Sequence, residues 1–205
     1  MDRQRVAKTW VFRGLCDLLF AFDSDDVSFE DNARFSEIMG LEKFLKAVLL
    51  FHRHQEYEGL SEYDAKAKLN ALAMKLGHDF KGMMKDLSGL GLCDIGRIER
   101  KDFDGYLGTD LIRAVGAGYM ETRYPVPRPI SDTFPIQGTG FTHDPLSSSG
   151  ITKYIYAVCN ACFHALSAQI DFADLRKQFR ERFEHRESFG RFNNLFWETR
   201  CREDL

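Results

Sequence analysis

A broadly apolar segment, residues 38–51, most constrains how this chain can fold. Its apolar side chains recur at the three- and four-residue spacing of a helix: Ile38, Leu41, Leu45 and Val48. Phenylalanines lie beside this stripe, so the apolar face is wide. A face this wide indicates a helix that several others contact, because a surface helix needs only a narrow apolar stripe. The segment therefore predicts the central helix of an all-α bundle.

The same periodicity predicts helices over most of the remaining chain. We expect them at residues 3–22, 28–51, 62–76, 80–88, 107–124, 150–170 and from 172 onward. Residues 92–103 are charged and ambiguous, and no convincing pair of strands is apparent. Phenylalanines at helical spacing continue through the last of these segments, which we expect to pack on the bundle or on a partner.

Polar residues mark where several helices begin and end. Ser28 is expected to cap the central helix, and Ser61 the next one, with Asp64 completing a capping box. Gly77 is a natural left-handed stop, and Asp79 can cap the helix that follows.

One long irregular connection is expected at residues 124–149. All five prolines fall between positions 125 and 145, together with glycines and a run of serines. A loop this long is a functional lid or a disordered insertion. The domain organisation predicted is therefore a helical bundle over residues 1–170, interrupted by this loop, and a C-terminal helical extension over 171–205.

The composition excludes several classes of protein. The 205 residues carry a formal net charge of −3, which gives no broad electrostatic footprint for nucleic acid, although a local basic patch stays open. No apolar run approaches the roughly 20 residues that cross a bilayer, and no secretory signal is apparent. The five cysteines are an odd number and scattered, which fits reduced thiols. We therefore expect a cytoplasmic protein.

No motif predicts a metal or cofactor site. Cys159 and Cys162 form a C-x-x-C inside a predicted helix, without the further ligands that zinc requires. We expect them to be small core residues. Phosphate-binding glycine loops, nucleophile elbows and HExxH are absent from the sequence.

Three segments resemble HEPN domains (higher eukaryotes and prokaryotes nucleotide-binding). MGLEKFLKAVLL, residues 39–50, is similar to the central helix of that family, which typically reads like aEKalKALL. KLGHDFKGMMKDL, residues 75–87, resembles the segment that follows it, and YMETRYP, residues 119–125, resembles the motif closing the next helix. The three occur in the family's order and cover about residues 28–170.

The resemblance implies a bundle of four or five helices, often dimeric. Many HEPN domains are ribonucleases in toxin–antitoxin or antiviral defence systems, while others bind nucleotides without catalysis or partner a nucleotidyltransferase. The leading expectation is therefore a module that engages nucleotide or RNA in such a setting. Its partner would be a nucleotidyltransferase, an antitoxin or a second copy of the chain.

The ribonuclease branch of the family carries an Arg and a His separated by four to six residues. The pair here that fits is Arg180 and His185, in RERFEH. As implied by the resemblance, two such pairs would meet across a dimer, with His185 acting as general acid/base and Arg180 stabilising phosphate charge. Alternatively, both residues belong to a polar face with Glu181 and Glu184.

A second cluster is expected near the end of the helix that closes before Pro125. Arg123 and Tyr124 lie there, and Lys43, Lys46 and His78 could lie near them in a bundle. Together they could hold a phosphate or a partner's carboxylates. Alternatively, Arg123 ties its helix end to an acidic side chain and Tyr124 packs.

The two lysines also have a simpler interpretation. Glu42 and Lys46 stand one turn apart in the order that favours an ion pair, on the narrow polar face of the central helix. This interpretation predicts a solvated face.

Two alternatives to the nucleotide- or RNA-binding module stay open. The first is a metal-independent endoribonuclease that uses Arg180 and His185. The second is a helical interaction or dimerisation module, whose small Ala157, Ala161 and Ala168 would let another helix approach.

Overall fold

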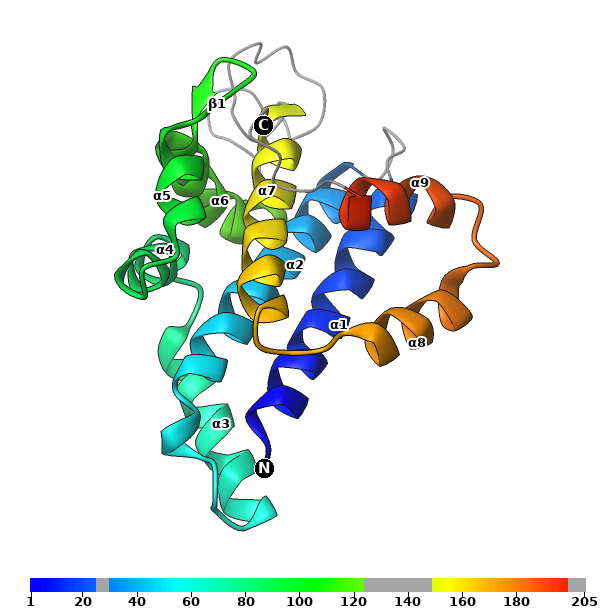
Figure 1. The fold of residues 1–205 in the computed structure, drawn as a ribbon. Coiled ribbons are helices and arrows are strands. Elements are labelled where there is room, and N and C mark those ends of the chain that lie inside the picture. The colour runs from blue at the N-terminus through cyan, green and yellow to red at the C-terminus, as the bar shows by residue number, and fades with distance from the viewer. Residues whose placement is uncertain (25–29, 124–148, 199–205) are drawn as a thin grey trace.

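Helices form nearly all the secondary structure of the computed structural model, which describes residues 1–24, 30–123 and 149–198 (Figure 1). The predicted all-α architecture is confirmed. The helices are α1 (Arg3–Asp23), α2 (Glu30–His52), α3 (Glu62–Leu76), α4 (Phe80–Gly89), α5 (Cys93–Arg100), α6 (Gly108–Arg123), α7 (Ser149–Ser167), α8 (Ala173–Phe183) and α9 (Phe189–Asn193). A 3-10 turn, η2 (His54–Glu56), follows α2, and a π turn, η4 (Asn194–Glu198), follows α9.

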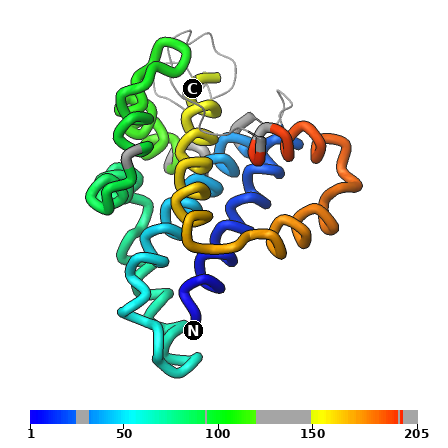
Figure 2. Tube along the Cα trace, in the orientation of Figure 1, coloured from blue at the N-terminus to red at the C-terminus, as the bar shows by residue number. Residues whose placement is uncertain are grey.

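The central element is α2, as its wide apolar face predicts. It contacts α1, α3, α4, α6 and α7, and it runs antiparallel to α1 (Figure 1). The stripe that predicted this role is fully buried: Ile38, Leu41, Leu45 and Val48. Figure 2 shows α4 and α5 on one side of this core and α8 and α9 on the other. No helix in the described ranges is long and apolar enough to cross a bilayer.

Two glycines let α1 and α2 approach each other closely. A methyl group built on Gly14 would lie 2.9 Å from the ring of Phe44 on α2. One built on Gly40 would lie 2.8 Å from Leu18 on α1. Each position would also come 3.2 Å from the other glycine's carbonyl oxygen. The closest part of this helix–helix contact therefore has no room for a side chain.

The helix-end signals around α3 and α4 are confirmed. Ser61 Oγ accepts a hydrogen bond from the Asp64 amide at 3.2 Å and donates one to the Asp64 carboxylate at 2.7 Å. Gly77 ends α3 with φ of 55°, and Asp79 accepts a hydrogen bond from the Gly82 amide at 2.9 Å. The predicted cap Ser28 lies outside the described residues.

A small antiparallel hairpin corrects the expectation that the chain has no strand pair. Strands β1 (Asp102–Phe103) and β2 (Tyr106–Leu107) pair between α5 and α6. Their two-residue loop is Asp104-Gly105, with φ of 55° and 92°. Asp-Gly loops favour such turns because both central residues need positive φ. Strands of two residues show no alternation, so periodicity could not detect them.

The C-terminal segment packs on α1. Phe179 of α8 meets Phe12 of α1 edge to face at 5.9 Å, and Phe192 and Phe196 are buried in the same core. Asp23, at the end of α1, accepts hydrogen bonds from the side chains that follow α8, Arg186 and Ser188. Residues 171–198 therefore share the hydrophobic core of the bundle.

The alanine face expected on α7 is partly covered by the chain itself. Ala161 is buried and Ala157 is half-buried, whereas His164 and Ala168 are exposed. Near the other end of α7, Thr152 receives a hydrogen bond from Arg34 of α2 at 2.8 Å. Ala161 therefore packs within the bundle, whereas Ala168, just past the end of α7, does not.

Candidate functional site

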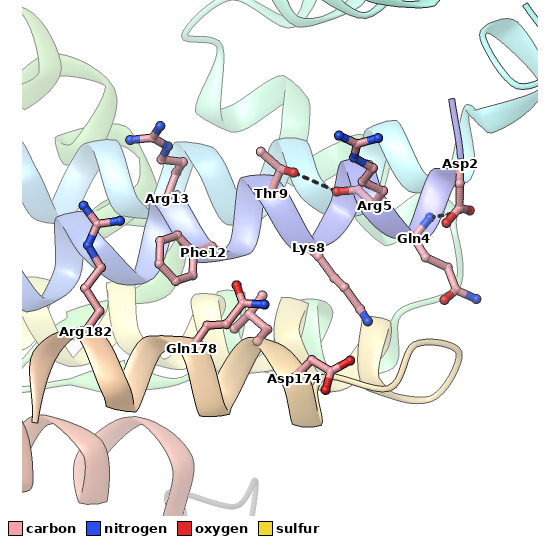
Figure 3. Close-up of a pocket in the computed structure, with 11 residues that line it drawn as sticks. Asp2, Gln4, Arg5, Lys8, Thr9, Phe12, Arg13, Asp174, Gln178 and Arg182 are labelled. Carbon is pink, nitrogen blue, oxygen red and sulfur yellow. Dashed lines mark hydrogen bonds between the residues drawn. The ribbon is translucent and has the colours of Figure 1, made fainter. Parts of the chain in front are cut away.

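A groove between α1 and α8 is a surface hollow lined mainly by cations and polar side chains. It has a volume of about 600 Å³. Figure 3 shows Lys8 reaching from α1 toward α8, while Arg182 reaches from α8 toward α1. The lining residues from α1 and its N-cap are Asp2, Gln4, Arg5, Lys8, Thr9, Phe12 and Arg13, and those from α8 are Asp174, Leu175, Gln178 and Arg182.

Positive charge predominates in this α1/α8 groove. Four cations line it, Arg5, Lys8, Arg13 and Arg182, against two carboxylates. Within the described ranges, none of the four forms an ion pair with a carboxylate. The chain as a whole carries a formal charge of −3, so the groove departs from the average surface. Cations without carboxylate partners are available to an anionic ligand.

An aromatic side chain lies among these cations. Phe12 is half-buried: its ring meets Phe179 edge to face, and its side chain also lines the groove. Beyond Phe12, Arg13 and Arg182, the hollow continues for about 230 Å³ toward Phe20, whose side chain is 51% exposed. The groove thus combines cations for phosphates with an aromatic surface on which a base can stack.

Cys16 lines this continuation and is half-buried. Burial raises the pKa of its thiol, and the positive charge of Arg182 acts in the opposite direction. The raised pKa favours the protonated thiol near neutral pH, which slows its reaction as a nucleophile.

The spacing of the cations sets the length of a suitable ligand. Arg5 and Arg13 are eight residues apart on α1, which corresponds to about 12 Å along the helix axis. Stacked nucleotides rise about 3.4 Å each along one strand. The cations therefore span about three to four nucleotides, more than one mononucleotide covers.

The lysines predicted to bind a ligand are each paired with a carboxylate. Lys43 donates a hydrogen bond to Asp17 of α1, and Lys46 donates one to Glu42 at 2.6 Å. Burial raises the pKa of the Asp17 carboxyl, against the effect of the Lys43 hydrogen bond. The predicted Glu42–Lys46 pair is present, but the expectation of a solvated face is wrong, since Glu42 is 4% and Lys46 5% exposed. The other helices packed around α2 cover the pair.

His78 joins this buried pair and links three parts of the fold. Its Nδ1 lies 2.8 Å from Glu42 of α2, and its Nε2 lies 2.9 Å from the hydroxyl of Tyr119 on α6. The rings of His78 and Tyr119 stack at 4.0 Å. The structure therefore brings Lys46 and His78 together, as predicted, but through Glu42. Both nitrogens of His78 are engaged, so the arrangement is a polar connection between α2, the start of α4 and α6.

Two other predicted ligand-binding residues fall at the edge of the described chain. Arg123 is the last residue of α6, and its side chain lies outside the described residues. Tyr124 and the rest of the predicted loop up to residue 148 lie outside them as well. Their roles stay predictions.

Neither residue of the predicted catalytic pair lines the α1/α8 groove. Arg180 lies on α8 and His185 in the turn that follows it, and both are exposed. Neither side chain forms a hydrogen bond or ion pair with another described residue. Arg180 is two residues from Arg182, about 200° around the helix, so it points away from the α1/α8 groove. A role across a dimer stays a prediction.

Cys159 and Cys162 are buried core residues of α7. Among the described residues, no group of three His, Cys, Asp or Glu could hold a metal ion. Burial raises the pKa of Cys162 to about 12 and that of Cys159 well above its usual value.

These two thiols are expected to resist alkylation in the native protein. The reactive species is the thiolate, which burial and a raised pKa both suppress. Residue-specific mass spectrometry should show Cys159 and Cys162 reacting with iodoacetamide at least about a hundred-fold more slowly than in denaturant. Cys16, which is half-buried, should react faster than either in the native state. Equal native rates at all three would contradict the buried placement.

No family model, curated protein or solved structure matches this chain. The resemblance to HEPN domains therefore depends on the three sequence segments that suggested it.

Sequence reasoning missed the groove, although one signal was present. Arg5, Lys8, Phe12 and Arg13 occur within nine residues of one helix. Only the packing of α8 beside this face turns it into a groove and adds Arg182. Glu42 and Tyr119 were likewise not expected as partners of His78, because they come from helices far apart in the sequence.

Proposed function

We propose that this chain is an HEPN-like helical module that binds single-stranded RNA or a nucleotide through the α1/α8 groove and does not itself cleave it. One observation carries the proposal: four cations that form no ion pair with a described carboxylate, together with Phe12, line one groove of a chain whose formal net charge is −3. Cations that track a phosphate backbone and an aromatic ring for stacking are the usual elements of single-strand recognition.

The shape of the groove favours an oligonucleotide over a mononucleotide. Its cations extend about 12 Å along α1, the rise of about three to four stacked nucleotides. A duplex hides its bases from Phe12, whereas a single strand presents them. The ligand that fits best is therefore a short single-stranded stretch of RNA.

The biological setting is part of the proposal through the resemblance alone. A toxin–antitoxin or antiviral defence role, with a nucleotidyltransferase or antitoxin as partner, stays a prediction. The groove supports binding of an anionic ligand, but it gives no information on the biological setting.

Fluorescence anisotropy with a labelled single-stranded oligonucleotide tests the proposal. The wild-type chain should bind in low salt, and affinity should fall as salt is added, because binding phosphates releases counterions. Lys8→Glu combined with Arg13→Glu should weaken binding about tenfold or more and reduce the salt dependence. Both side chains border the groove, and neither lies in the hydrophobic core.

A variant with the same change in charge outside the groove is the matched control. Lys177→Glu with Arg113→Glu alters exposed cations of α8 and α6. This control should keep wild-type affinity to within about threefold, because neither residue lines the groove. Absence of wild-type binding in low salt, or equal losses in both double variants, would overturn the proposal.

The same samples separate binding from cleavage. RNA recovered after incubation without metal should be intact. If it is cut, and His185→Ala abolishes the cutting with helical content unchanged, the endoribonuclease alternative is correct and the non-catalytic proposal is wrong.

A further inference from the structure

The α1/α8 groove has two unlike ends. Figure 3 shows Asp2 and Asp174 at one end and Arg13 and Arg182 at the other. Arg13 and Arg182 also line the smaller hollow that continues past the groove toward Phe20. We refer to this smaller hollow, of about 230 Å³, as the Phe20 hollow. An anionic ligand is therefore attracted most strongly to the end of the groove that opens into the Phe20 hollow.

The chain itself bridges the two helices beyond the Phe20 hollow. Asp23, at the end of α1, accepts hydrogen bonds from the side chains of Arg186 and Ser188, which follow α8. Arg186 also lines the hollow, so the bridge borders it directly. A strand that lies between α1 and α8 meets this bridge. The hollow therefore suits the end of a strand better than its middle.

The walls of the Phe20 hollow are apolar between the arginines. The side chains that form them are Phe12, Cys16, Leu19, Phe20 and Phe183. The hollow is smaller than the usual pocket for a drug-sized ligand, which has about 300–1,000 Å³, so it has room for one base rather than for several nucleotides. Aromatic walls favour a flat base, because the base can stack on them.

Two arginines without carboxylate partners converge on the Phe20 hollow. Neither Arg13 nor Arg182 forms an ion pair with a described carboxylate. Burial raises the pKa of the Cys16 thiol, and the positive charges of Arg182 and Arg13 both oppose this effect, so both guanidiniums lie near the thiol. The guanidinium of Arg182 also lies 5.6 Å from the centroid of the Phe183 ring. Guanidiniums placed in this way can bind a phosphate through charge-assisted hydrogen bonds.

We propose that the Phe20 hollow binds the terminal nucleotide of a single strand whose end carries a phosphate monoester. The base lies against the aromatic walls, and Arg13 and Arg182 bind the terminal phosphate. A phosphate monoester carries a charge of about −1.5 to −2 near neutral pH, whereas each internal phosphate carries one negative charge. The inference rests on the proposed function, because the rest of the strand occupies the α1/α8 groove.

Competition between short RNA strands of one sequence tests this inference, since a 5′ or a 3′ end can supply the monoester. Unlabelled strands with a 5′-phosphate, a 3′-phosphate or hydroxyls at both ends displace a common labelled strand from the wild-type chain. At least one phosphorylated form should compete about tenfold better than the hydroxyl form. Equal competition by all three forms overturns the inference and leaves the proposed function standing, whereas failure of every form to bind rejects both.

Two matched variants separate the hollow from a general effect of charge. Arg182→Gln should remove the preference for the phosphorylated form, because it takes away one of the two guanidiniums at the hollow. Arg5→Gln removes a positive charge from the groove outside the hollow, so it should weaken all three forms by a similar factor and keep the preference. Both side chains are exposed, so helical content should stay the same. Equal loss of the preference in both variants would overturn the inference.

The alkylation rate of Cys16 reports directly on whether the Phe20 hollow is occupied. At a concentration about ten times its Kd, the preferred strand should slow the reaction of Cys16 with iodoacetamide about tenfold, because the fraction of chains with an empty hollow falls by that factor. Residue-specific mass spectrometry measures this rate. An unchanged rate at the same degree of binding would mean that the strand end lies elsewhere, and the inference would be wrong.

Discussion

Glu42→Ala is expected to lower the free energy of unfolding by about 3–5 kcal/mol, because it leaves the ammonium of Lys46 buried without a carboxylate. Lys46 is 5% exposed, and the Nδ1 of His78 would lose its hydrogen-bond partner as well. Urea denaturation followed by circular dichroism measures the change as a lower midpoint with little change in slope.

Two further variants test whether the loss of stability in Glu42→Ala comes from the uncompensated charge of Lys46. Glu42→Leu combined with Lys46→Met removes both charges and should recover most of the stability, since an apolar pair can replace a buried ion pair. Glu181→Ala breaks an exposed pair with Lys177 and should change stability by less than about 0.5 kcal/mol. If Glu42→Ala lost as little stability as Glu181→Ala, water would have to reach the Lys46 ammonium easily.

Gly40→Val is expected to destabilise the chain by about 3 kcal/mol. The first carbon of the new side chain would lie 2.8 Å from Leu18 and 3.2 Å from the carbonyl oxygen of Gly14. The backbone of α1 cannot move away without opening the contact between α1 and α2. Thermal and urea unfolding should both report the loss, and the far-ultraviolet spectrum should stay helical.

The same substitution at Gly116 is the matched control. Gly116 lies inside α6, and apart from the adjacent backbone of α6 no described atom comes within 4 Å of the position that its Cβ would occupy. Helix propensity alone slightly favours valine over glycine, so Gly116→Val should stay within about 0.5 kcal/mol of the wild type. If the two variants were equally stable, the close approach of α1 and α2 would be contradicted.

The helical architecture was predictable because its signals are local. The wide apolar face of residues 38–51 indicated a central helix, and α2 occupies that position. Ser61 and Asp79 marked helix starts because their side chains accept hydrogen bonds from amides a few residues later, and Gly77 marked a helix end because its amide donates to carbonyls a few residues earlier. The β1–β2 hairpin escaped because two-residue strands carry no periodic signal, although its Asp-Gly loop was visible.

The candidate sites were harder to predict because their members come from distant parts of the chain. The sequence predicted that Lys46 and His78 lie in one cluster, which is correct. It also predicted that this cluster binds a ligand. The structure pairs them with Glu42, which lies between them. The pair Arg180 and His185 matched a family spacing, whereas the groove on α8 uses Arg182, which points the other way.

The sequence alone determined where the helices form and which face of each is apolar, because backbone hydrogen bonding and side-chain periodicity act within a few residues. Only the tertiary structure decided which polar residues face water. Packing of α8 beside α1 made a cationic groove from side chains that α1 alone would leave as an ordinary exposed face. Packing around α2 buried Glu42 and Lys46, which its sequence pattern presented as a surface pair. Burial depends on neighbours that are distant in sequence, so no local pattern encodes it.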